Sequence, residues 1–221
     1  MNKNFKILNE FKGFGEPSGK IWFIGIEEAG VWSKDPNECK KEIEGYRNSR
    51  GFRYNDGNDS LNSPVYVTIS KIMSELNGNG MDWSAYRKLN LFREGSDVFQ
   101  MNLFPLGKKR VVDWPGHYKA VFGYGKEDYK RYISNVKTTR FQMLEDFWNK
   151  KSPEVTICFG KTYWSEFQKL LNLNGHHETY EDGFIILYRE ERVVLTPFFG
   201  HGHMSDGRIQ TLVKILKDTL V

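Results

Sequence analysis

The chain has 221 residues, of which 39% are hydrophobic and 27% charged, and its formal net charge is +4. This composition excludes an intrinsically disordered or membrane-spanning chain, and the length suits one domain with a full hydrophobic core. The chain has 2 cysteines, which excludes a disulfide framework and favours a cytoplasmic protein. The mild positive charge permits a polyanionic partner without requiring one.

The predicted elements alternate between short apolar strands and helices. In chain order they are a strand at residues 21–26, a long polar loop at 31–62 with a short helix near 37–46, helices at 64–76 and 82–91, a strand at 97–103, a helix at 127–149, a strand at 155–159, a helix at 161–173, strands at 184–188 and 193–197, and a last helix that begins at Ser205 or Asp206. This alternation predicts an α/β fold, a single three-layer α/β/α domain over residues 1–221 around a central, mostly parallel four-stranded sheet.

Polar side chains follow three of these strands. Glu27 and Glu28 come directly after the first strand, Asn102 lies near the end of the second, and His201 and His203 follow the last. Open α/β sheets bind ligands at the carboxyl ends of their strands. We therefore expect acid, amide and imidazole to meet at one edge of the sheet and to form a catalytic cleft.

The acid and the amide each allow two interpretations. Glu27 is either a solvated loop acid or a group that positions or deprotonates a water molecule. Gly25 and Gly30 favour the second interpretation, since glycine lets a ligand approach the backbone closely. Asn102 either secures the following turn or offers an acceptor and two donors to a ligand such as a nucleobase.

The remaining candidates are also ambiguous on their own. His201 and His203 could be loop residues, metal ligands, or donors to a developing oxyanion, although their spacing is weak evidence for a metal. The run formed by Lys108, Lys109 and Arg110 is either a solvated loop or a phosphate contact. Met204 either packs under the last helix or acts as a wedge in a base stack.

Taken in order, these motifs resemble those of the uracil-DNA glycosylase superfamily. Residues 25–29, Gly-Ile-Glu-Glu-Ala, are similar to its first motif, with Glu27 at the place of the water-activating residue. Residues 99–105, Phe-Gln-Met-Asn-Leu-Phe-Pro, are similar to the strand whose Asn holds the flipped pyrimidine. Residues 156–160 are similar to its third strand, and residues 196–205 to its histidine loop and apolar wedge.

The resemblance implies a DNA N-glycosylase, of base-excision repair or of defence against modified foreign DNA. Such an enzyme flips a nucleotide out and hydrolyses its glycosidic bond without a metal or organic cofactor. It implies a monomer whose partner is DNA and not a membrane. Glu28 stands where the family has proline, residues 200–203, Gly-His-Gly-His, stand where it has His-Pro-Ser, and the polar loop is long. These departures leave both a uracil-like base and a bulkier or modified base open as the substrate. The implied catalytic residues are Glu27 with His201 or His203; the substrate-binding residues are Gly25, Ile26, Glu28, Asn102 and Phe104; the DNA-binding residues are Lys108, Lys109, Arg110, Met204 and Ser205.

Two other classes of function stay open at this point. The first is a glycosylase-like fold that only binds nucleic acid or a protein. The second is a metal-dependent hydrolase that uses Glu27, Glu28 and His201 or His203.

Overall fold

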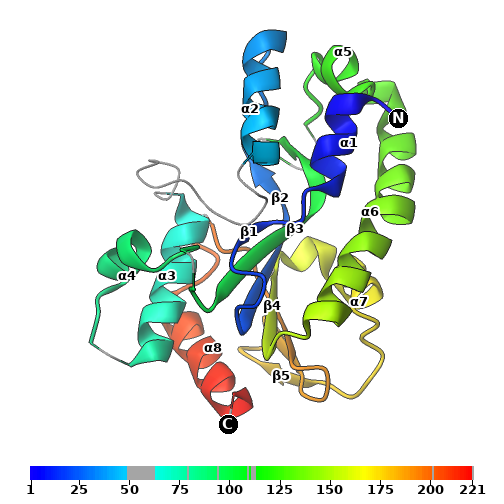
Figure 1. Cartoon of the computed structure of the whole chain (residues 1–221). Helices are drawn as coiled ribbons and strands as arrows, with labels where there is room; N and C mark the ends of the chain where they lie inside the picture. The colour runs from blue at the N-terminus through cyan, green and yellow to red at the C-terminus, as the bar shows by residue number, and fades with distance from the viewer. Residues whose placement is uncertain are drawn as a thin grey trace.

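A mixed sheet runs through the centre of the molecule, with helices on both of its faces (Figure 1). The computed structural model describes residues 1–48, 63–78, 80–93, 95–108, 110, 113–200 and 202–220, and within these ranges the side chains of all but residues 28, 29 and 46–48. The strands are β1 (Phe14–Gly15), β2 (Ile21–Ala29), β3 (Val98–Lys108), β4 (Val155–Phe159), β5 (Glu178–Tyr180), β6 (Ile185–Tyr188) and β7 (Val193–Thr196).

The strand order is β1-β3-β2-β4-β7-β6-β5. The four central strands, β3, β2, β4 and β7, pair in parallel, whereas β1, β6 and β5 join the sheet antiparallel. The α/β class is confirmed, but the expected sheet of four strands is wrong, because seven strands pair in one mixed sheet. β6 turns back onto β7 through residues 189–192, and so short a connection permits only antiparallel pairing.

The helices follow the order expected from the sequence, with additions. They are α1 (Lys3–Glu10), α2 (Pro36–Asn48), α3 (Pro64–Asn77), α4 (Trp83–Leu89), α5 (Tyr118–Phe122), α6 (Tyr129–Lys151), α7 (Trp164–Leu170) and α8 (Asp206–Thr219), with short 3₁₀ turns η2 (Lys126–Asp128) and η3 (Lys161–Tyr163). The helix near residues 37–46 is confirmed as α2. Residues 49–62 of the predicted loop lie outside the described residues.

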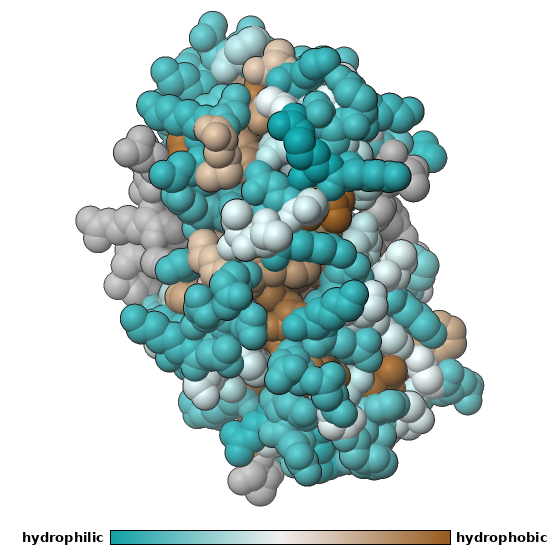
Figure 2. Space-filling model, turned by 90° about the vertical axis from the view of Figure 1, so that its right-hand side faces the viewer, coloured by the Kyte–Doolittle hydropathy of each residue, from teal (hydrophilic) through white to brown (hydrophobic). Residues whose placement is uncertain are grey.

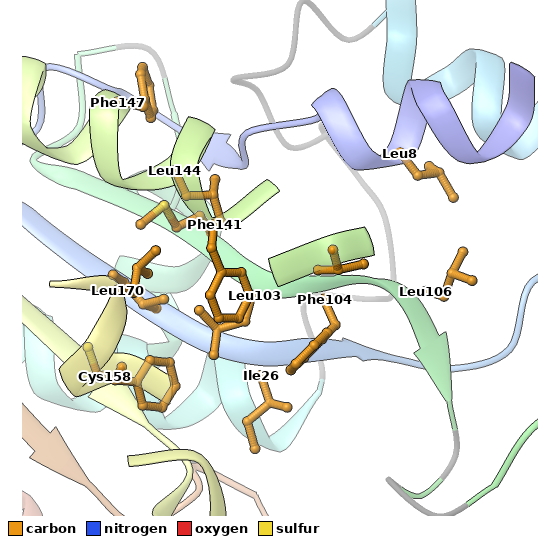
Figure 3. Packing of buried hydrophobic residues seen from close by; sticks show 14 of the residues in the cluster. Leu8, Ile26, Leu103, Phe104, Leu106, Phe141, Leu144, Phe147, Cys158 and Leu170 are labelled. Carbon is orange, nitrogen blue, oxygen red and sulfur yellow. The ribbon is translucent and has the colours of Figure 1, made fainter. Parts of the chain in front are cut away.

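Strand alternation divides the core between the two faces of the sheet. Trp22 and Ile24 point to the side covered by α1, α5, α6 and α7, whereas Ile21 and Phe23 point to the side covered by α3, α4 and α8. Figure 3 shows the first of these cores, where Leu103 and Phe141 pack beside Phe104. Both faces of the central strands are therefore buried, and side chains reach solvent mainly at the strand ends.

Side-chain caps begin two of the helices that pack on the second face. Ser63 accepts a hydrogen bond from the backbone of Tyr66 ahead of Pro64, and Ser205 accepts one from the backbone of Arg208. Ser205, rather than Asp206, is thus the N-cap of α8. These caps fix where α3 and α8 begin, at the end of the sheet where β2 and β7 finish.

The layer of α6 retains some apolar surface. Ile133, Met143 and Trp148 of α6 are only partly buried against the core, and Figure 2 shows apolar patches between hydrophilic regions on this flank of the molecule. Across the described part of the chain, the helices are each too short or too polar to span a bilayer.

Candidate active site

The parallel pairing of β2 and β3 brings Gly25 next to Asn102, near the middle of each strand. The two residues are partners in the parallel ladder. A Cβ atom on Gly25 would lie 2.4 Å from Oδ1 of Asn102 and 2.7 Å from the ring of Phe159, which is closer than a Cβ atom can come. The absence of a side chain at Gly25 therefore lets an amide and an aromatic ring pack over the middle of β2.

Asn102 is the one partly exposed residue of β3, and the other ten are buried. Within the described ranges, no protein group forms a hydrogen bond with its side-chain amide. An amide in this state keeps one acceptor and two donors for a ligand. The structure is compatible with the second interpretation of Asn102, because its amide is a partly exposed polar group within an otherwise buried strand.

Arg140 of α6 holds the backbone of Asn102 from the other side of the sheet. Arg140 is 2% exposed, and its guanidinium donates hydrogen bonds to five backbone carbonyls. These carbonyls belong to Leu8, Asn9, Phe11, Asn102 and Leu103. One buried cation therefore ties the end of α1 and the middle of β3 to α6, which fixes the backbone of Asn102.

The space on that side of Asn102 is small. A cavity of about 20 Å³ lies between α1, β1 and β3, with Phe11, Asn102, Phe104 and Arg140 among its lining residues. A cavity of this size holds one water molecule and no base. A ligand of Asn102 must therefore approach from the side on which this residue is partly exposed.

Glu27 forms a buried ion pair with Lys108 at the ends of β2 and β3. Oε2 of Glu27 lies 3.2 Å from Nζ of Lys108, and the two side chains are 9% and 2% exposed. Burial raises the pKa of Glu27 to about 7, although the ammonium of Lys108 opposes this shift. The carboxyl group is thus divided between its acid and its carboxylate forms near neutral pH.

Aromatic rings enclose this ion pair. The ammonium of Lys108 lies 5.8 Å from the ring centroid of Trp114 and 5.4 Å from that of Tyr129. Burial, with the charge of Glu27 as a further cause, raises the pKa of Tyr129 and of Tyr163 above the usual phenol value. These phenols therefore stay neutral, and the enclosure keeps the local dielectric low around the one carboxyl and one ammonium group.

The turn after β7 packs over the same end of the sheet. Phe199 stacks on Phe159 with ring centroids 4.6 Å apart, and its carbonyl accepts a hydrogen bond from Oγ1 of Thr68. His203 lies further along this turn with an exposed side chain, and its carbonyl accepts a hydrogen bond from Arg208. The aromatic pair thus joins this turn to the ring that covers Gly25.

Several predicted site residues have other positions than expected. Lys108 is buried in the ion pair, so it is not placed as a surface contact for phosphate. Phe104 is 3% exposed and packs against Tyr163 and Phe141, and Figure 3 shows it on the buried side of β3. Met204 is 9% exposed in the core under α8, which corresponds to the packing interpretation rather than the wedge.

The other predicted residues are only partly described. Ile26 is buried against Gly160, and Arg110 is exposed with its guanidinium 4.0 Å from Asp113. The predicted residues outside the described set are Lys109, His201 and the side chain of Glu28. Sequence reasoning missed Arg140 altogether and did not pair Lys108 with Glu27.

The comparisons with known proteins identify no relative. No protein-family model matches the sequence, and no curated protein matches it. Among the described residues, no three His, Cys, Asp or Glu side chains form a group that could hold a metal ion. The interpretation of the site therefore rests on its own geometry.

Proposed function

We propose that the protein is a DNA N-glycosylase that removes a flipped-out, uracil-like or modified base by hydrolysis. The observation that carries this proposal is a buried acid close to an exposed amide. Glu27, in its ion pair with Lys108, lies two residues beyond Gly25, and Asn102, the partner of Gly25 in the ladder, offers its amide to solvent. Two residues of strand span about 6.6 Å. An acid and an amide carried at nearby positions of paired strands suit a nucleotide whose base meets the amide while its sugar meets the acid.

Glycosidic hydrolysis gives each group a distinct task. The bond between the sugar C1′ and the base nitrogen breaks, and its electron pair leaves with the base. A carboxylate at Glu27 stabilises the oxocarbenium-like sugar and orients the water whose oxygen bonds to C1′. The proton released by that water finally resides on the departed base, so no further reactant is required.

Lys108 supports this chemistry without contacting the substrate. The carboxylate form of Glu27 is the reactive one, and burial works against it. An ammonium at 3.2 Å favours that form. Lys108 is therefore a positioning residue that keeps a charged acid within an apolar enclosure.

The amide and the last turn serve the leaving base. Asn102 holds the polar edge of the base, and the stacked rings of Phe159 and Phe199 form the apolar floor beside Gly25. Negative charge develops on the base as the bond breaks, and a neutral imidazole stabilises it by donating a hydrogen bond. His203 is the described histidine on the turn after β7, and it is the candidate for this donor.

Base release from defined duplexes tests the proposal. Purified protein is incubated with duplexes that carry uracil, other deaminated or oxidised pyrimidines, or hypermodified bases, and free base is measured by mass spectrometry. We expect release from at least one duplex. DNA binding without release from any of them would contradict glycosylase activity and favour a binding module.

The role of Glu27 has its own test. We expect Glu27→Gln to lower base release by roughly 10² to 10⁴, the usual contribution of such a group, because a neutral amide carries no charge to stabilise the sugar cation and takes no proton from water. Glu190→Gln, an exposed acid in the β6–β7 turn, is the matched control and should release base as the wild type does. Wild-type rates in Glu27→Gln would show that this carboxylate is not catalytic.

A further inference from the structure

Two cations share one aromatic ring on the surface near the proposed active site. Nζ of Lys161 lies 4.4 Å from the ring centroid of Phe184, and the guanidinium of Arg208 lies 4.0 Å from the same centroid. Lys161 also lies 5.2 Å from the ring centroid of Trp164. Attraction to the faces of aromatic rings therefore holds two positive charges together at the surface.

Both cations are anchored by carbonyl groups and keep donors to spare. Nζ of Lys161 donates to the carbonyl of Gly183, and Nη1 of Arg208 donates to the carbonyl of His203. Neither forms an ion pair with any carboxylate in the described residues, including Glu181, which accepts a hydrogen bond from Thr211 instead. An ammonium has three donors and a guanidinium has five, so most of them remain for an anion.

This pair lies at the edge of the sheet that carries the site. Lys161 follows Gly160 at the end of β4, and a Cβ on Gly160 would lie 2.5 Å from Cδ1 of Ile26, the residue before Glu27. Arg208 is in the first turn of α8 and contacts the carbonyl of His203. The two cations therefore flank the ends of β4 and β7, next to the end of β2.

The basic run at residues 108–110 does not provide an equivalent pair. Lys108 is buried against Glu27, and Arg110 lies 4.0 Å from the carboxylate of Asp113. Arg208 and Lys161 come from segments far apart in the sequence, and the fold alone brings them together. Cations without carboxylate partners beside a proposed nucleotide site are suited to phosphodiester groups, which bind guanidinium and ammonium groups strongly.

We infer that Lys161 and Arg208, held on Phe184, bind the phosphodiester backbone of a DNA strand whose flipped nucleotide enters the site beside Asn102. This inference rests on the proposed function, because that function supplies the DNA. It assigns the backbone contact to the ends of β4 and β7 instead of the run at residues 108–110. The contact recognises the strand and carries no information about which base is removed.

Salt-dependent DNA binding tests the inference separately from catalysis. The probe is a short fluorescein-labelled duplex of unmodified DNA, titrated by anisotropy between about 50 and 200 mM NaCl. We expect the double variant Lys161→Gln/Arg208→Gln to bind about 10-fold more weakly than wild type. The slope of log affinity against log salt should become shallower by about 1 for each phosphate that the variant no longer neutralises.

The control removes the same charge elsewhere. Lys214→Gln/Lys217→Gln lies on the exposed side of α8, about 9 to 14 Å further along the helix. It should bind DNA as wild type does, and an equal loss in both double variants would overturn the inference. Lys161→Arg/Arg208→Lys keeps both charges and should bind normally, which separates the effect of charge from that of misfolding.

The outcomes also distinguish this inference from the proposed function. A wild-type protein that binds DNA through these cations but releases no base would support the contact and reject the glycosylase. A wild-type protein that does not bind the duplex at any of these salt concentrations would overturn both. Unchanged affinity and salt slope in Lys161→Gln/Arg208→Gln would overturn the contact and leave the proposed function standing.

Discussion

The role assigned to Lys108 depends on a single contact. In the sequence it begins a basic run, yet in the structure it continues β3 and meets Glu27 inside the molecule at 3.2 Å. Leaving either charge unpaired inside the protein would be costly, since a buried ion pair that loses one partner keeps an uncompensated charge. The two residues must therefore be considered as one unit in any test of the site.

We predict that Lys108→Met shifts the acid limb of the pH–rate profile upward. The wild-type carboxyl group has its pKa raised to about 7, with Lys108 opposing that shift. Without the ammonium the pKa rises further, so the reactive carboxylate forms only at higher pH. We expect the limb to move by about 1 pH unit or more.

Base-release rates from about pH 5 to 9 would measure this shift, across the range where such carboxyl and imidazole groups titrate. An NMR titration of the Glu27 side-chain carboxyl carbon would measure the same pKa without relying on activity. Lys108→Arg, which keeps a cation, is the control and should retain an acid limb near that of wild type. An unmoved limb and an unmoved Glu27 titration in Lys108→Met would contradict the role of Lys108.

At the scale of the element, α6 holds the middle of β3 and the end of α1 in place. Arg140 reaches from this helix to carbonyls of both α1 and β3. The guanidinium of Arg140 is the donor that these carbonyls share, and its planar arrangement of N–H groups lets it reach several carbonyls at once. α6 therefore contributes to the site by fixing the backbone of Asn102, besides covering one face of the sheet.

We predict that Arg140→Ala lowers the free energy of unfolding by at least about 2 kcal/mol, because buried carbonyls are left without donors. Urea unfolding followed by circular dichroism would measure the loss. Lys150→Ala, an exposed site on the same helix, should change stability by no more than about 0.5 kcal/mol. A similar small effect in Arg140→Ala would show that water replaces the guanidinium at these carbonyls.

The elements that the sequence predicted well are those with a strong apolar pattern. The strand at residues 155–159 is confirmed to the residue as β4, since five buried side chains follow one another there. β5 was not predicted because its three residues are only partly buried or exposed. β1 has two residues, too few for any periodicity. Both short strands exist through pairing with a neighbour, which a local pattern does not contain.

The candidate site could likewise be predicted only in part, because several of its contacts join residues that are far apart in the sequence. Gly25 and Asn102 were identified from their places at strand ends, and the ladder does pair them. Arg140 had a local signal, since it lies four residues from both Val136 and Leu144 on the buried stripe of α6. The Glu27–Lys108 pair had none, because it depends on β3 extending beyond Pro105 to Lys108.

At the scale of the whole molecule, Glu27 links the site to stability. In the folded protein its carboxyl group keeps a proton up to about pH 7, whereas its unperturbed pKa is 4.5. The folded state therefore binds more protons than the unfolded chain between these two values. Stability must then fall as pH rises through this window, because ionising the group costs more inside the protein than outside.

We predict that wild type loses at least about 1 kcal/mol of unfolding free energy relative to Glu27→Gln between about pH 5 and pH 7.5. Urea unfolding of both proteins at a series of pH values would give the difference directly. Both proteins contain every other titrating group, so the pH dependence of the difference comes from Glu27 together with its partner Lys108. A constant difference across this range would show that Glu27 has an ordinary pKa in the folded protein.

The hydrogen bonds from Arg140 to five carbonyls also determine at which end of the chain a tag or label is best attached. Three of these carbonyls belong to residues 8–11, so Arg140 links the first helix to the strand that carries Asn102. Affinity tags, fluorophores or surface tethers joined ahead of Lys3 would strain the hydrogen bonds that make this link. The end of α8 has no such link to Asn102 in the described part of the chain, which makes the C-terminal side the sound choice for immobilising or labelling this protein.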